Sequence, residues 1–134
     1  MVTYTDSLDG VEPAHLEGFF VGWPSPPPPE RHLTLLAGSS HVVLARDDEG
    51  RVVGFITAVS DGVLAAYIPL LEVLPEWQDR GIGTELVRRM LDGLSSFYMV
   101  DLVCDDELVP YYRRFGMQHL SGMAIRNSAA LEVG

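Results

Sequence analysis

The feature that most constrains the fold is a change of hydrophobic period at Gly81. Before it, residues 63–74 (VLAAYIPLLEVL) form a nearly continuous apolar run, which is typical of a buried strand. After it, residues 84–94 (TELVRRMLDGL) carry their apolar side chains at helical spacing. The stretch LPEWQDRGIG between them places two glycines at the entrance of the predicted helix. A strand, a glycine turn and a helix in this order predict a backbone that comes very close to another group.

Turn residues and hydrophobic periodicity divide the rest of the chain into further elements. In the first part of the chain we expect a first strand, a short helix over 11–20 that presents Phe19 and Phe20, a stiff connection at SPPPPE and a helical turn or two over 30–37. A hairpin over 41–62, closed at DDEG, then leads to the strand and helix described above. After that helix we expect a strand over 97–104, a second helix over 105–116 that stops at Gly116, and a closing hairpin over 117–127 around Ser121-Gly122. Together these elements predict one mixed α/β (α+β) domain over residues 1–134 without internal repeats.

The overall charge narrows the range of partners. The chain has a formal net charge of -10, which argues against nucleic acid, because phosphate backbones are bound by clustered Lys and Arg. Its acidic surface favours solubility and, to a smaller extent, the binding of cationic small molecules.

The single cysteine, Cys104, and the four histidines show no metal-ligand spacing, so we expect no metal. The N-terminus lacks a signal-peptide pattern and Glu72 interrupts the longest apolar stretch, so we expect a cytoplasmic protein without a membrane span.

The glycine turn has the chemistry of a phosphate cradle. The N-terminus of a helix leaves several N–H groups without partners and carries the positive end of the helix dipole. Glycines let such a backbone approach a bulky anion. The dinucleotide fingerprint does not fit, because it needs a third glycine where the chain has Leu86. The Walker A loop does not fit either, because it needs a lysine that this stretch lacks.

The pattern Gln-x-x-Gly-x-Gly, on the step from a long strand to an amphipathic helix, resembles the GCN5-related N-acetyltransferases (GNAT). The resemblance covers roughly residues 42–126, from the hairpin through VPYYRRFGM. It implies that acetyl-CoA is the cosubstrate and that its pyrophosphate is held, mainly by backbone N–H groups, at Gln78, Asp79, Arg80, Gly81, Ile82, Gly83 and Thr84.

The same resemblance implies the architecture around the central strand. It predicts a mixed, mostly antiparallel sheet that is flanked by helices and whose central strands splay apart. The pantetheine arm would enter this gap and pair with free backbone groups at Leu71, Glu72 and Val73, as an added strand would. Members of the family often form homodimers through C-terminal strands, so a homodimer is possible here.

A tyrosine on the last helix is the family's usual general acid. By position this residue is Tyr112, four residues before Gly116, whereas Tyr111 points about 100° away around the helix. A phenol with a pKa near 10 suits a thiolate leaving group. The alternative is that Tyr112 is only a core residue, because it shares one helical face with Leu108 and Phe115.

The general base is less well defined. VCDDELVPYYRRFGM is similar to the arylalkylamine N-acetyltransferases, which carry two histidines on the central strand. The matching positions here are Tyr67 and Pro69, so that substrate class and the identity of the base both stay open. Deprotonating an alkylamine at pH 7 costs about 4 to 5 kcal/mol, so some group or water chain must accept the proton. Glu72 and Tyr67 are the two candidates.

The resemblance therefore implies an enzyme that transfers an acetyl group directly, through a tetrahedral intermediate, to a primary amine of a small molecule. The alternatives are a peptide or protein N-acetyltransferase and a non-catalytic acyl-CoA sensor of the same fold. An interaction module that docks through SPPPPE is a third class. Phe19, Phe20 and Trp23 are either an aromatic wall for the acceptor or the core contact that docks the N-terminal helices.

Overall fold

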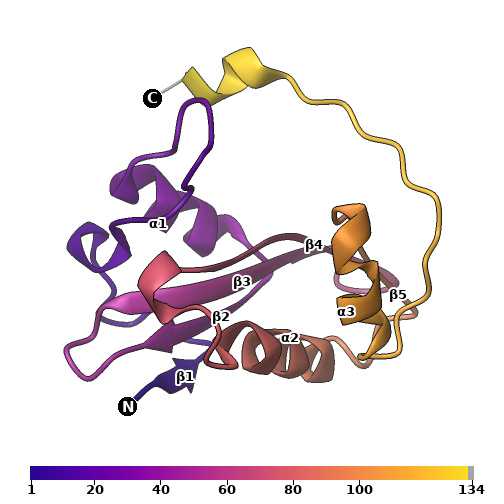
Figure 1. The fold of residues 1–134 in the computed structure, drawn as a ribbon, viewed down its shortest axis with the longest axis horizontal. Coiled ribbons are helices and arrows are strands. Elements are labelled where there is room, and N and C mark those ends of the chain that lie inside the picture. Colours follow the sequence, from indigo (N-terminus) through magenta and orange to yellow (C-terminus); the bar gives the residue numbers. More distant parts are fainter. Residues whose placement is uncertain (133–134) are drawn as a thin grey trace.

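A five-stranded sheet organises the chain. The computed structural model describes residues 1–132. The strands lie in sequence order across the sheet and are β1 (Thr3–Thr5), β2 (His41–Arg46), β3 (Val52–Ser60), β4 (Ala65–Val73) and β5 (Met99–Leu102). The first four are antiparallel neighbours and β5 runs parallel to β4 (Figure 1). The predicted mixed, mostly antiparallel sheet is confirmed.

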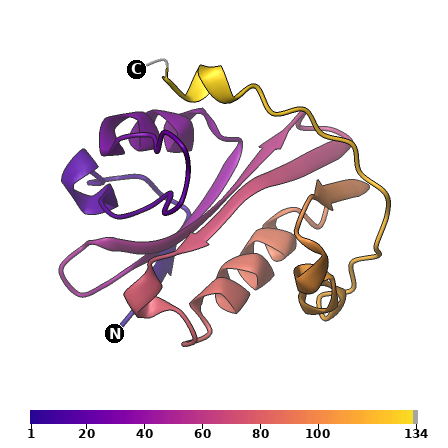
Figure 2. The same cartoon turned by 45° about the horizontal axis from the view of Figure 1, so that its top comes forward.

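Helices cover both faces of this sheet (Figure 2). The short helix η1 (Pro13–Leu16) and helix α1 (Pro29–Gly38) lie on one face, and α2 (Ile82–Gly93) with α3 (Val109–Arg113) lies on the other. Side chains alternate between the two faces along β3. Phe55 packs on the aromatic rings of the α1 side, whereas Gly54 faces Ile82 and Leu86 of α2.

The C-terminal half of β4, residues 69–73, does not pair with β5, and a bulge lies where the pairing ends. The register between β3 and β4 shifts after Thr57, so that Ile68 and Pro69 of β4 stand opposite a single residue of β3. Pairing between β4 and β5 ends at Ile68 and Leu102. Proline has no N–H to give to a ladder and is typical of bulges and strand edges. Residues 69–73 therefore keep β3 on one side and, within residues 1–132, have no strand on the other, which confirms the predicted splay.

Two sequence predictions need correction. The helix expected over 11–20 is only the four-residue η1, because Glu17 is already extended and Gly18 has a φ of 96°. The hairpin expected over 117–127 is wrong, since this segment pairs with no strand within residues 1–132. It runs as an extended tail around the outside of the molecule to the short helix η4 (Ser128–Glu132) (Figure 1).

The second predicted helix, over 105–116, is also divided. Its first part is the short helix η3 (Asp106–Leu108), which leads directly into α3. The chain turns at Gly116, whose φ of 87° ends the helical segment as predicted. Within residues 1–132, no helix is both long and apolar enough to cross a membrane.

Candidate active site

The turn before α2 exposes a row of backbone N–H groups. The chain leaves β4, passes through the short helix η2 (Pro75–Trp77) and enters α2 at its N-cap, Gly81. The left-handed backbone of Gly81, with φ 82°, explains why glycine stands there. The first helical hydrogen bond runs from the Glu85 N–H to the Gly81 carbonyl, at 3.1 Å. Within residues 1–132, the N–H groups of residues 82–84 therefore have no backbone acceptor.

The space outside this turn is open, whereas its inner side is packed. A Cβ atom added to Gly81 would meet no atom within 4 Å. One added to Gly83 would touch Val73 Cγ2 at 3.8 Å and the Tyr111 hydroxyl at 3.9 Å. The Tyr111 hydroxyl also shares a hydrogen bond of 3.1 Å with Thr84 Oγ1. The two glycines thus differ: Gly81 leaves room for a bulky group, and Gly83 lies against β4 and α3.

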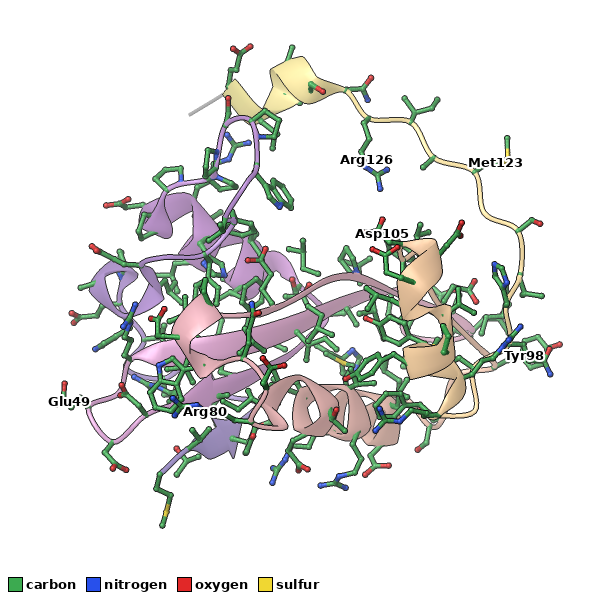
Figure 3. All side chains as sticks on the ribbon, in the orientation of Figure 1. Glu49, Arg80, Tyr98, Asp105, Met123 and Arg126 are labelled. Atoms are coloured by element: carbon green, nitrogen blue, oxygen red, sulfur yellow. The ribbon has the colours of Figure 1, made fainter. Side chains whose placement is uncertain are left out.

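Two of the polar side chains in the turn already have protein partners. Arg80 stacks on the Trp77 ring, 4.8 Å from its centroid, and donates to the Glu76 carbonyl at 3.1 Å. Arg80 lies at the outer surface of the turn (Figure 3). The Gln78 side chain instead reaches back to β4. Any anion at this turn would therefore meet backbone N–H groups and the positive field of Arg80.

The free edge of β4 presents the backbone of Leu71 and Val73. The Leu74 N–H donates to the Val53 carbonyl of β3 at 2.9 Å. Because backbone groups alternate in direction along a strand, those of Leu71 and Val73 point away from β3, toward the gap. Gln78 Nε2 donates to the Val73 carbonyl at 3.1 Å. Of the three residues predicted to pair with pantetheine, Glu72 is therefore excluded, because its backbone groups point toward β3. The Val73 carbonyl is covered by an amide side chain, and Leu71 is left open.

Two clefts meet at this edge. The first, here called the N-terminal cleft, has a volume of about 640 Å³ and lies between β4 and the segment around Phe19, Val21 and Trp23. The second, here called the α3 cleft, has a volume of about 310 Å³ and lies between β4 and the residues around Cys104, Leu108 and Tyr112. Both clefts are lined by Pro69, Leu70 and Leu71. The two clefts therefore adjoin at these three residues.

Tyr112 is the titratable side chain of interest in the α3 cleft. Burial raises the pKa of its phenol to about 12, and the neighbouring Tyr111 and Cys104 add to the shift. The phenol therefore stays protonated throughout the neutral and moderately alkaline range. Figure 3 shows Arg126 directed from the extended tail toward the region of Asp105, and both residues line this cleft.

Glu72 is the titratable side chain of the N-terminal cleft. Its Oε1 atom accepts the Phe20 N–H at 2.8 Å. Burial raises the pKa of the Glu72 carboxyl, and the hydrogen bond from Phe20 opposes that shift. Tyr67 is placed differently, because it lies in the half of β4 that still pairs with β5, opposite Asp101. It lines neither cleft.

The aromatic residues before the proline segment make the predicted core contact, and two of them also line a cleft. Phe20 is buried, and its ring lies 4.9 Å from that of His32 and 5.0 Å from that of Trp23. Phe19 is also part of the core, yet it lines the N-terminal cleft together with the partly exposed Trp23. The core contact therefore fixes the wall of the cleft.

His32 lies beneath this wall and was not singled out in the sequence. Its side chain is buried among the rings of Phe19, Phe20 and Phe55. Burial lowers the pKa of the imidazole to about 4, and the nearby Leu16 carbonyl only partly opposes this shift. His32 is therefore neutral at pH 7.

Two further contacts could not be read from the sequence. The bond between Phe20 and Glu72 joins residues 52 positions apart, and the bond between Gln78 and Val73 depends on the shape of the turn. Only Pro69 gave a local signal, since proline inside a strand pattern indicates a bulge or an edge. Within residues 1–132, no group of three or more His, Cys, Asp or Glu side chains is placed to hold a metal ion.

Comparison with known proteins identifies the family of the chain. The model of the acetyltransferase (GNAT) family matches residues 8–117. A crystal structure from Deinococcus radiodurans R1, assigned as an acetyltransferase, is 48% identical with a TM-score of 0.93 and covers 96% of this chain and 90% of its own. A GNAT-family acetyltransferase from Streptococcus pneumoniae TIGR4 is 29% identical with a TM-score of 0.75, covering 95% and 98%.

A more distant relative shares the fold alone. Glucosamine-6-phosphate N-acetyltransferase from Arabidopsis thaliana is 14% identical with a TM-score of 0.68, covering 94% of this chain and 97% of its own. No curated protein is significantly similar to the chain in sequence.

Proposed function

The chain belongs to the acetyltransferase (GNAT) family, and we propose that it transfers the acetyl group of acetyl-CoA to a primary amine of a small molecule. The observation that carries this proposal is the meeting of the two clefts at residues 69–71. Tyr112 lines the α3 cleft, and Glu72 lines the N-terminal cleft. Donor and acceptor would thus approach the same backbone from opposite sides.

The residues of the turn fit the diphosphate of acetyl-CoA. The free N–H groups at the start of α2 would donate to it, and the open space outside Gly81 would admit it. Leu71 would pair with the pantetheine arm through its free backbone groups, and Val73 would do the same once Gln78 releases its carbonyl. When bound, acetyl-CoA supplies an acyl group that is activated as a thioester.

Glu72 is the better placed of the two candidate bases. It lines the N-terminal cleft beside residues 69–71, whereas Tyr67 lies in the half of β4 that pairs with β5 and lines neither cleft. The acceptor must lose a proton before its nitrogen lone pair can attack the thioester carbon. Glu72 would accept that proton directly or through a water molecule, and its raised pKa makes it a stronger base than an exposed carboxylate.

Tyr112 would act on the leaving group. Attack by the amine would give the tetrahedral intermediate, and as its C–S bond breaks the phenol would donate its proton to the departing sulfur. The phenolate would then recover a proton from the nitrogen, which loses its second proton as the amide forms. In water a thiol with an ordinary pKa of about 8.5 is a stronger acid than a phenol, so proton transfer from the phenol to the thiolate is a mismatch of pKa values. Burial in the same cleft raises the basicity of the sulfur as well, which reduces the mismatch.

The proposal is tested by measuring CoA release from acetyl-CoA with a panel of amines, and acetyl-CoA binding by calorimetry. The Gly81→Glu variant should lose measurable binding, because a carboxylate would occupy and repel the diphosphate position. Gly62→Glu is the matched control, since Gly62 also has a positive φ, 78°, and open space around its Cα. It should bind normally. Undiminished binding by Gly81→Glu would refute the cradle, and binding without turnover of any amine would favour the acyl-CoA sensor.

A further inference from the structure

Gln78 departs from the role that its motif implies. The sequence pattern assigns this residue to the diphosphate of acetyl-CoA, together with the glycines of the turn. In the structure its side chain folds back instead, and Nε2 donates to the carbonyl of Val73, five residues earlier, at 3.1 Å. The Gln78 amide is therefore engaged on the strand edge along which the pantetheine arm would lie.

The backbone of the turn holds Gln78 in this position. Its N–H donates to the Pro75 carbonyl at 3.3 Å, and its φ of -70° and ψ of 163° are extended. The next residue, Asp79, has a φ of 64°, so the backbone turns immediately after Gln78. Gln78 is exposed, and it lines the N-terminal cleft together with Val73. A ligand that enters the cleft therefore reaches this contact without any change in the core.

The Gln78 side chain and the pantetheine arm carry the same kind of donor. The arm contains two secondary amides, and Gln78 ends in a primary amide, so both can donate an N–H to a backbone carbonyl. A carbonyl left bare on a free strand edge is a ready site for pairing with another chain. The Gln78 amide covers the Val73 carbonyl while the arm is absent. An arm that lies along β4 as an added strand needs the space beside this carbonyl that Gln78 fills.

We propose that Gln78 is an internal competitor of the pantetheine arm: its amide binds the Val73 carbonyl in the free protein, releases it as acetyl-CoA enters and binds it again as CoA leaves. This inference rests on the proposed function and adds a regulation of the same site. The competition lowers the affinity for acetyl-CoA and speeds the release of CoA, a step that limits turnover in many enzymes. It does not act on the nucleotide half of CoA, because that half carries no arm.

Binding of the whole ligand and of its nucleotide half tests the competition. Kd is measured by calorimetry for acetyl-CoA, for CoA and for 3′-phosphoadenosine 5′-diphosphate, which keeps the diphosphate and lacks the arm. Gln78→Met keeps the length of the side chain and removes the donor, whereas Gln78→Asn keeps the amide and shortens its reach. Both variants should bind acetyl-CoA and CoA about 5-fold more tightly, the usual contribution of one hydrogen bond, and the nucleotide with unchanged affinity. Release of CoA, followed by stopped-flow displacement, should slow by a similar factor.

The side-chain amide signals report the exchange directly. The chain has two glutamines and one asparagine, so their NH2 groups give three pairs of signals in a nitrogen–proton correlation spectrum. The pair from Gln78, assigned by its loss in Gln78→Met, should move on addition of CoA and much less with the nucleotide half. Gln118→Met is the matched control, because Gln118 is the other glutamine, is exposed and lines neither of the two clefts. It should bind all three ligands as the parent does.

The outcomes separate the inference from the proposed function. If Gln78→Met changes the affinity for acetyl-CoA and for the nucleotide by the same factor, Gln78 acts on the diphosphate, so the inference is overturned and the proposed function stands. Unchanged affinity for acetyl-CoA in both Gln78→Met and Gln78→Asn also overturns it. If neither the parent nor the variants bind acetyl-CoA, the proposed function itself fails and the inference fails with it.

Discussion

The two clefts beside β4 share three residues, but their outer walls are built in different ways. The wall of the N-terminal cleft rests on the hydrophobic core through Phe19, behind which Phe20 is exposed by only 2% and His32 by 1%. The wall of the α3 cleft consists of a five-residue helix and is followed by an extended tail in which Met123 is 98% exposed. The fold therefore fixes the position of Glu72 through many buried contacts and that of Tyr112 through few. Three predictions test this contrast.

The largest expected effect is on stability. Phe20→Ala should lower the free energy of unfolding by about 3–5 kcal/mol, the usual cost of removing a buried phenylalanine ring. Met123→Ala should change it by no more than about 0.5 kcal/mol, because the side chain has no buried surface to lose. Urea denaturation followed by circular dichroism measures both. Equal effects of the two substitutions would contradict the difference between the two walls.

A second prediction concerns the pH dependence of stability. The pKa of His32 is lowered from 6.5 to about 4 in the folded protein, so folding favours the neutral ring. Its contribution is fully present above pH 6.5 and is lost as the pH falls toward 4, because the unfolded chain then binds the proton more tightly. The loss amounts to about 3 kcal/mol at 1.36 kcal/mol per pKa unit.

The His32→Leu variant isolates this contribution. It should lose less stability than the parent protein between pH 7 and pH 4, by roughly the same amount of about 3 kcal/mol. His119→Leu, at an exposed histidine, should keep the parent's pH dependence. Parallel stability curves for His32→Leu and the parent would mean that the His32 ring is not held neutral by the aromatic residues around it.

The same contrast explains what could be predicted from the sequence. The sheet, α2 and the turn at Gly81 follow from local patterns, namely strand alternation, helical spacing and glycine at a left-handed position. The tail over 117–127 was predicted wrongly: Ser121-Gly122 permits a turn, but Leu120, Met123 and Ile125 stay 72%, 98% and 83% exposed and give a hairpin no buried face.

Long-range contacts were beyond the reach of the sequence. The hydrogen bond between Phe20 and Glu72 requires a loop before α1 to meet the far end of β4. Motif spacing led to Tyr112, because its distance from Gly116 is local. It could not show that Tyr111 instead bonds to Thr84, since that contact depends on how α3 packs against α2. Local signals thus identified the residue types of the site, and tertiary packing decided their partners.

The smallest effect in free energy, but the most informative for mechanism, is expected at Tyr112. Tyr112→Phe removes only the hydroxyl, so acetyl-CoA should bind as before while kcat falls by about 100-fold, the lower range for loss of a general acid. Because the pKa of Tyr112 is raised to about 12, the parent's kcat should show no loss from Tyr112 ionisation below about pH 11.

Tyr111→Phe is the matched control. It breaks the 3.1 Å bond to Thr84 and should change kcat by only a few-fold. A larger loss of kcat in Tyr111→Phe than in Tyr112→Phe would mean that Tyr111, and not Tyr112, is the general acid.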